Sequence, residues 1–287
     1  MPSVHSNAPP PLHTLPSNVP DFPAEPPSRH RRSVSTLRLL LAILATGTLL
    51  GVVQTVVGFD QLARWAVSVA SNARLPGSDL PQSRNWAGYA ATGGAFTEVS
   101  ATWSVPQFAP DSPAGADAIW VGIGGVHGND LIQAGTQETV SGQGSTSYQA
   151  WVETLPQASR PVPLPISAGD SVSISLQEQA SGNWLVDFVN NTSGRSYQIT
   201  IACASSHSSA EWVVEAPTAR RGRILRLDAF GSVSFAQAGT VRDGQQLTIA
   251  QAGGHPITMI GQRGQALARP SALDEDGTGF NVLQSLR

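Results

Sequence analysis

The chain has 287 residues, which is room for one large domain or two small ones. Only 13% of the residues are charged, while 28 are glycine and 21 are proline, a composition that favours an all-β protein over a helical one. Residues 85–287 hold 10 arginines against 16 acidic residues (10 − 16 = −6), and this acidic balance counts against nucleic acid as a partner.

Cys203 is the single cysteine of the chain. It rules out an intrachain disulfide and leaves no basis for a cysteine-based metal site. Because a lone cysteine is more often a small buried apolar side chain than a catalytic thiol, we interpret Cys203 as a core residue.

The N-terminal part predicts a membrane anchor. Residues 1–35 are rich in proline and poor in apolar side chains, so we expect a disordered tail. An uncharged run of 21 residues follows at 39–59. At about 1.5 Å per residue, a helix of this length crosses the ~30 Å hydrocarbon core of a bilayer. We therefore predict a transmembrane signal-anchor helix over 36–59.

Arginines cluster just before this run and should stay in the cytoplasm, so the part of the chain after the run would lie outside it, attached to the cell membrane. The alternative is a cleaved signal with a small-residue site ending at Ala73, which would give a secreted protein. Residues 60–84 are expected to form a linker or stalk.

From Asn85 onward, strand-like segments recur about every ten residues between clusters of Gly, Pro, Asn and Ser. Examples are "FTEVSATWSVP", "AIWVGIG", "SYQAWVETLP" and "AEWVVEAP". No segment after Arg84 has a helical period. These features predict a single, monomeric β-sandwich or barrel domain over 85–287.

Several hydrolase signatures are missing, namely H-E-x-x-H, G-x-S-x-G and D-[ST]-G. His127, His207 and His255 are isolated in the sequence, and no glycine-rich loop leads from a strand into a helix. We therefore expect no metal and no cofactor.

Side chains two residues apart share one face of a strand. In "SYQAWVE", Gln149, Trp151 and Glu153 form a polar face with a large aromatic ring, which suits the wall of a substrate groove. Comparable faces are Trp120/Gly122/Gly124, Leu131/Gln133/Gly135 and Glu211/Val213/Glu215. The alternative is the ordinary polar outer face of a sandwich. Glu211 and Glu215 lie ~13 Å apart along one strand and cannot act as a pair.

Six segments in this order and spacing resemble the glutamic peptidases, or eqolisins: "NWAGYAATGGAFTEVSATWSVP", "AIWVGIGG", "DLIQAG", "SYQAWVE", "ISAGDSV" and "AEWVVEAP". The resemblance covers about residues 85–235, and "PITMIGQRGQALARPSALDEDGTGFNVL" is similar to the closing strands of that family. It implies an all-β, lectin-like β-sandwich of two large antiparallel sheets.

The resemblance also implies a catalytic pair, Gln133 and Glu215, and an acid-acting endopeptidase with a polypeptide substrate. It places Trp120, together with the strand that carries Gln149, Trp151 and Glu153, in the substrate groove. Gly124 and Gln149 stand where fungal members carry an acid, and the family's disulfide cysteines are missing. These departures bear on pH preference and subsite specificity.

The chemistry of the two side chains suits amide hydrolysis. An ionised Glu215 can take a proton from water, while the Gln133 amide can stabilise the oxyanion. Two alternatives stay open: a glycan hydrolase that uses Glu153 and Glu215 at ~5–5.5 Å, and a non-catalytic binding module at the cell surface.

Overall fold

A computed structural model describes residues 81–109, 111–128, 130–219 and 222–285. The regular structure of these residues is β, without an α-helix. The strands are β1 Gln82–Ser83, β2 Trp86–Thr92, β3 Phe96–Ser104, β4 Gly115–Ile123, β5 Ile132–Val140, β6 Thr146–Thr154, β7 Arg160–Pro161, β8 Ser171–Ala180, β9 Asn183–Asn190, β10 Arg195–Ala202, β11 Ser209–Glu215, β12 Thr218–Ala219, β13 Arg223–Ile224, β14 Ser232–Arg242, β15 Gln245–Thr248, β16 His255–Ile260, β17 Ala266–Pro270 and β18 Phe280–Gln284.

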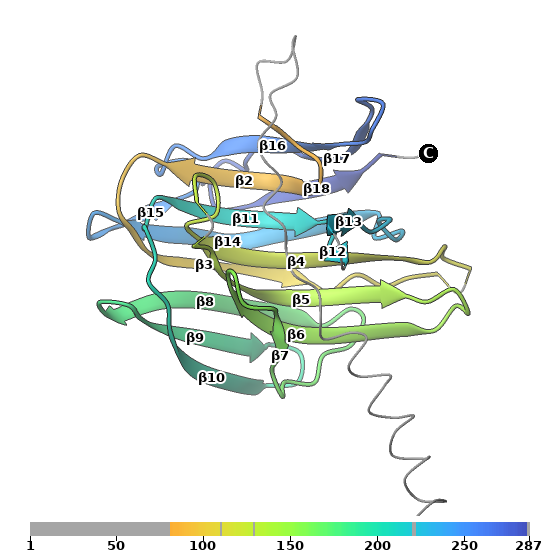
Figure 1. Ribbon diagram of the computed structural model, residues 1–287, viewed down its shortest axis with the longest axis horizontal. Helices are drawn as coiled ribbons and strands as arrows, with labels where there is room; N and C mark the ends of the chain where they lie inside the picture. Colours follow the sequence, from red (N-terminus) through yellow and green to blue (C-terminus); the bar gives the residue numbers. More distant parts are fainter. Residues whose placement is uncertain (1–80, 110, 129, 220–221, 286–287) are drawn as a thin grey trace, which may run out of the picture. The chain divides into compact units, whose positions relative to one another are not determined.

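The strands form two layers (Figure 1). The front layer has the order β16-β2-β11-β4-β5-β6-β7, and the back layer has the order β10-β9-β8-β3-β14-β18-β17. The layers are joined through the β16–β17 pair, and the pairs along this path are antiparallel. The predicted all-β fold with large antiparallel sheets is confirmed.

Large apolar side chains fill the space between the layers, as the period of two predicts. Trp212 and Val214 of β11 face inward, as do Ile132 and Ala134 of β5. Two indole hydrogen bonds tie the layers together. Trp103 of β3 donates to the Thr136 hydroxyl over 3.0 Å, and Trp212 donates to the Ser100 carbonyl, also over 3.0 Å.

Cys203 lies in this inter-layer core, as predicted, and burial raises the pKa of its thiol. The thiolate is the reactive form of cysteine, so this environment disfavours that form.

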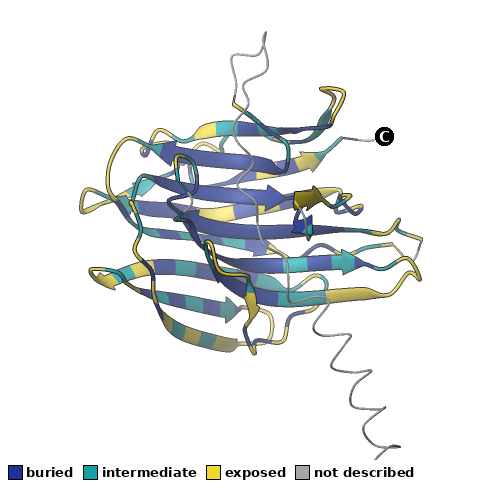
Figure 2. Cartoon of the chain, in the orientation of Figure 1, coloured by how far each residue is buried: buried dark blue, intermediate teal, exposed yellow. Residues whose placement is uncertain are grey.

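The central strands of the front layer are buried on both faces. In Figure 2, β8 and β9 alternate between buried and more exposed residues, whereas β2, β11 and β4 are buried along almost their whole length. A second apolar cluster covers their outer face: Trp86, Ala90, Ala118, Trp120, Leu131, Trp151, Val213 and Ile257. Polar groups on this face therefore lie in a low-dielectric environment.

The predicted tail, transmembrane helix and most of the linker lie outside the described residues. Within the described ranges, no helix has the length and hydropathy of a membrane span. Gln82 and Ser83 pair in parallel with Thr258 and Met259 of β16, so sheet structure begins just before the predicted domain start at Asn85.

Candidate active site

Five adjacent strands of the front layer place the predicted site residues on its outer face. Backbone register aligns their side chains in three rows. Read from β2 to β6, the rows are Ala90–Glu211–Gly122–Gln133–Glu153, Gly88–Val213–Trp120–Gly135–Trp151 and Trp86–Glu215–Ala118–Gln137–Gln149. Gln133 and Glu215 thus share one face, with the row of Trp120 between them.

Two glycines make room for the Trp120 ring. A Cβ on Gly122 would lie 2.9 Å from Cζ3 of Trp120, and a Cβ on Gly135 would lie 2.6 Å from its Cβ. Trp86 packs edge-on against the same ring, with centroids 5.0 Å apart and planes at 78°. This packing fixes the indole in the centre of the site.

Glu215 is fully buried and held by neutral donors. Its Oε1 accepts a hydrogen bond of 2.8 Å from Nδ2 of Asn85, and its Oε2 accepts one of 2.9 Å from Nε1 of Trp120. Burial raises the pKa of Glu215 well above its usual value, and the charge of Glu153 raises it further. The indole and amide donors partly offset that rise. On balance, Glu215 holds its proton to a higher pH than a solvent-exposed glutamate does.

Gln133 makes its side-chain contact with Glu153, not with Glu215. Its Nε2 donates to Oε2 of Glu153 over 2.5 Å, and its Oε1 accepts no hydrogen bond from a described residue. Both side chains are buried. Glu153 also raises the pKa of Glu215. It therefore interacts with both members of the predicted pair, through a hydrogen bond with Gln133 and through its charge with Glu215.

The remaining predicted residues lie around this centre. Trp151 is buried in the outer-face cluster, and its Nε1 has no hydrogen-bond acceptor among the described residues. Gln149 lies opposite Gln137 at the end of its row. Gly124 follows β4 with φ of 103°, and its N–H donates to the Ser209 carbonyl over 3.0 Å. Its backbone therefore lies at the rim of the site, where a side chain would be strained.

Sequence reasoning missed Asn85 and gave Glu211 no role of its own. Asn85 holds Glu215 although 130 residues separate them; "NWAGY" lies at the start of the resemblance, but no role was assigned to its asparagine. Glu211 is buried in the row of Gln133, where Gly125 N–H donates to its Oε1 over 3.2 Å, and burial is the main reason that its pKa rises to about 8. Glu211 is therefore a neutral acid below that pH.

One condition for the glycan-hydrolase alternative is not met. That reading would be favoured by Gln133 pointing away from the two carboxyl groups, whereas its amide contacts Glu153 directly. Two carboxyl groups and an amide, with apolar packing around them, form a group of side chains that is chemically able to carry out acid–base hydrolysis.

Residues 84–280 match the model of the Peptidase A4 family. This is more than half of the chain, so the chain belongs to that family, and it is a glutamic endopeptidase. It is 25% identical to aspergillopepsin-2 of Aspergillus niger over 221 residues, which are 68% of this chain and 77% of the relative. It is 32% identical to scytalidopepsin B of Scytalidium lignicola over 137 residues, 46% of this chain and 51% of that protein.

Solved structures agree on the fold. Scytalido-glutamic peptidase with a peptide-based transition-state analogue has a TM-score of 0.60 at 23% identity, covering 70% of this chain and 98% of that one. Aspergilloglutamic peptidase from Aspergillus niger has a TM-score of 0.53 at 25% identity, covering 60% of this chain and 99% of that one.

Proposed function

We propose that this protein is an endopeptidase that acts at mildly acidic pH on extended polypeptides, with Glu215 as general base and acid and Gln133 as oxyanion donor. The observation that carries the proposal is the environment of Glu215. It is a fully buried carboxyl group whose two oxygens each accept a hydrogen bond from an uncharged donor. Such a group can gain and lose a proton without breaking an ion pair.

In the proposed reaction, ionised Glu215 takes a proton from a water molecule as the water oxygen bonds to the peptide carbonyl carbon. The carbonyl π electrons move onto oxygen and give a tetrahedral intermediate. Glu215 then gives the proton to the peptide nitrogen, the C–N bond breaks, and acid and amine are released. No bond forms between substrate and protein.

Gln133 is suited to the oxyanion. Its Nε2 has two hydrogens, and the contact with Glu153 uses one of them. The second can donate to the oxyanion of a bound substrate. Glu153 thereby orients the Gln133 amide, and it acts as a positioning residue for the catalytic pair. An amide keeps its donor at all relevant pH values, which a carboxyl group does not.

The proposed pH range follows from the base. Glu215 must be ionised to accept a proton, and its pKa is raised well above 4.5. Activity therefore increases as pH rises through that pKa, which favours mildly acidic over strongly acidic conditions.

The test is cleavage of casein or haemoglobin by the full chain in detergent across pH 3–7. We expect Gln133→Ala to lose on the order of 10²–10³ in kcat, and Glu215→Gln to lose on the order of 10²–10⁴. Gln198→Ala and Glu275→Gln are matched controls at exposed positions and should retain activity. Full activity in either site variant, with wild-type circular dichroism, would overturn the pair.

We further propose that residues 39–59 anchor the protein in the cell membrane with the catalytic domain outside the cytoplasm. The support is the uncharged run of 21 residues after an arginine cluster. Membranes washed with alkaline carbonate should retain the protein, and protease added to the extracytoplasmic side should remove its catalytic domain. Release by carbonate would contradict the anchor.

A further inference from the structure

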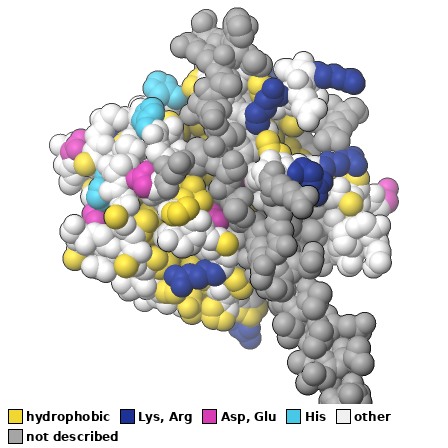
Figure 3. Space-filling model, viewed as in Figure 1, with side chains coloured by type: hydrophobic (Ala, Val, Ile, Leu, Met, Phe, Trp, Pro, Cys, Tyr) yellow, Lys and Arg dark blue, Asp and Glu magenta, His cyan; other side chains and the backbone are white. Residues whose placement is uncertain are grey.

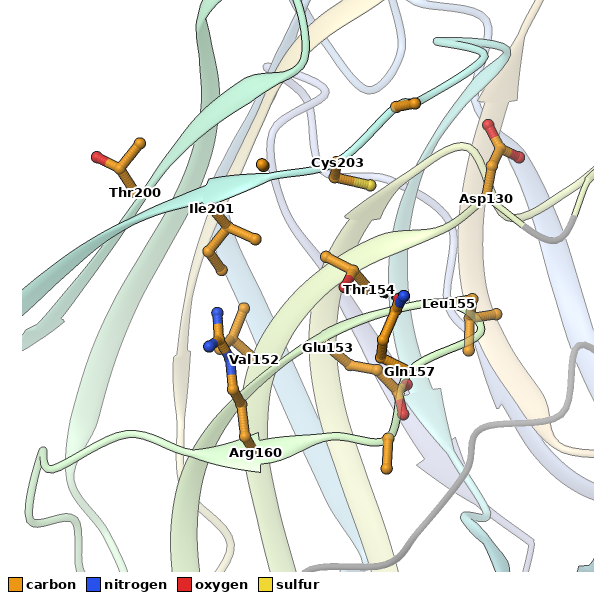
Figure 4. Close-up of a pocket in the computed structure, with 13 residues that line it drawn as sticks. Asp130, Val152, Glu153, Thr154, Leu155, Gln157, Arg160, Thr200, Ile201 and Cys203 are labelled. Carbon is orange, nitrogen blue, oxygen red and sulfur yellow. Dashed lines mark hydrogen bonds between the residues drawn. The ribbon is translucent and has the colours of Figure 1, made fainter.

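A cleft of about 750 Å³ lies beside the proposed catalytic site. It is bounded on one side by the end of β6, the following turn and β7. On the other side lie the end of β10 and the segment that leads to β11 (Figure 4). Glu153 belongs both to the catalytic row and to the wall of this cleft. A polypeptide bound at Gln133 can therefore extend into it.

The lining of the cleft combines apolar surface with three charged groups. Leu155 and Ala158 supply apolar surface, together with the small exposed parts of Ile201 and Cys203. The charged groups are Arg160, Glu153 and Asp130, and Figure 4 places Asp130 at the opposite end from Arg160.

The two carboxyl groups already accept hydrogen bonds from the protein, whereas the guanidinium donates to no described acceptor. Glu153 accepts the Gln133 amide, and Asp130 accepts the backbone N–H of Ser206. The Arg160 side chain is exposed, and its guanidinium makes no hydrogen bond or ion pair with any described residue. It is thus the charged group in the cleft that remains available to a ligand.

The position of Arg160 suits a particular kind of side chain. Arg160 pairs with Val152 across β6 and β7, and its guanidinium points toward Val152 and Ile201 (Figure 4). Methylene groups of a ligand can pack on the exposed edge of Ile201, whereas Val152 is fully buried. A guanidinium then offers paired N–H donors that match a carboxylate.

We propose that this cleft is a substrate subsite for an acidic side chain, glutamate or aspartate, and that Arg160 binds its carboxylate. The proposal rests on the endopeptidase function above and adds the substrate preference. Neighbouring strands lie about 4.8 Å apart, so β7 is roughly 10 Å from β5, which carries Gln133. An extended peptide rises about 3.3 Å per residue. The acidic residue therefore belongs about three residues from the cleaved bond.

The experiment uses the full chain and a set of internally quenched peptides at pH 5, where a glutamate side chain is mostly ionised. The parent peptide has no acidic residue. In each other member one position, within four residues on either side of the cleaved bond, carries Glu or its isostere Gln. We expect one position, about three residues away, at which Glu exceeds Gln by about tenfold in kcat/KM.

Variants assign the preference to the guanidinium. Arg160→Gln should lower the ratio of kcat/KM between the Glu peptide and its Gln isostere to about one. Arg160→Glu should favour Lys over Gln at the same position. Arg195→Gln, an exposed arginine on β10 that does not line the cleft, is the matched control and should keep the Glu preference.

Two results would overturn the subsite: no Glu preference at any position in the wild type, or a preference that persists in Arg160→Gln. Cleavage of the parent peptide shows whether the subsite proposal alone is wrong or whether the proposed catalytic pair is wrong as well. Its cleavage by the wild type and its resistance to Glu215→Gln test the catalytic pair without reference to Arg160.

Discussion

Gln133 donates its side-chain amide to Glu153 over 2.5 Å, and Glu153 in turn raises the pKa of Glu215. One carboxyl group therefore orients the proposed oxyanion donor and adjusts the proposed base. Residues from β5, β6 and β11 are coupled in this way, although β4 lies between β5 and β11.

Glu153→Gln should shift the acidic limb of the pH–activity profile to lower pH. The substitution removes the negative charge that raises the pKa of Glu215, so the base becomes ionised at a lower pH. The measurement is kcat/KM on a neutral peptide from pH 3 to 7, which reports the ionisation of the free enzyme. Glu275→Gln, at an exposed position, should leave the limb in place. A limb that moves to higher pH would contradict the coupling.

Stability should fall as pH rises, because three carboxyl groups are buried together between the layers. Asp117 and Glu138 are cross-strand partners, and the Asp117 side chain also interacts with Asp228. Burial raises the pKa of Glu138 to about 8 and that of Asp228 to about 9. The unfolded chain releases these protons near pH 4–5, so the free energy of unfolding should fall as pH rises from there toward 8.

Glu138→Gln should relieve part of this loss. Melting temperatures at pH 4 should be close to the wild-type value, whereas at pH 7.5 the variant should melt higher. Glu275→Gln, the exposed control, should follow the wild type at both pH values. A wild-type melting temperature that is constant from pH 4 to 8 would show that the buried groups do not titrate on unfolding.

Burial of acidic side chains also affects the surface charge of the domain. Six of the 16 acidic residues in 85–287 are buried: Asp117, Glu138, Glu153, Glu211, Glu215 and Asp228. Acidic side chains are sparse on the face shown in Figure 3. The formal charge of −6 therefore overstates the negative charge of the surface whenever the buried groups hold protons.

Gly135→Ala should damage both folding and activity. A Cβ at this position would lie 2.1 Å from the Ile119 carbonyl oxygen and would press on Trp120, so β4 and β5 must shift. We expect a loss of about 1–3 kcal/mol in the free energy of unfolding, measured by chemical denaturation, and lower kcat on casein because Trp120 holds Glu215. Gly142→Ala meets nothing within 4 Å and should be neutral in both assays. Equal stability of the two variants would contradict the close packing around the indole.

Much of the fold could be predicted locally. In "SYQAWVE" and "AEWVVE", the residues that alternate with the predicted groove-facing side chains are Ala150, Val152, Trp212 and Val214, and all four lie in the inter-layer cluster. Alternation works because successive side chains of a strand point to opposite faces whatever its neighbours are. It also placed Gln133 on the face of Leu131, where the structure has it.

Exposure could not be predicted in the same way. The outer-face tryptophans 120 and 151 were expected to line an open groove, yet both are buried in the second cluster. Alternation assigns a residue to a face, but what covers that face depends on neighbouring strands and loops. The order β2-β11-β4-β5-β6 places residues that are far apart in sequence side by side.

The sequence by itself determined the strand periodicity and the face of each candidate side chain, because these depend on residue types at short spacing. The order of six motifs along the chain also indicated the family. Only the tertiary structure decided that Asn85 and Trp120 hold Glu215, that Gln133 contacts Glu153 and that Arg160 lines a cleft. Each of these contacts crosses strands, and strand order and register are set by long-range hydrogen bonds that no local pattern encodes.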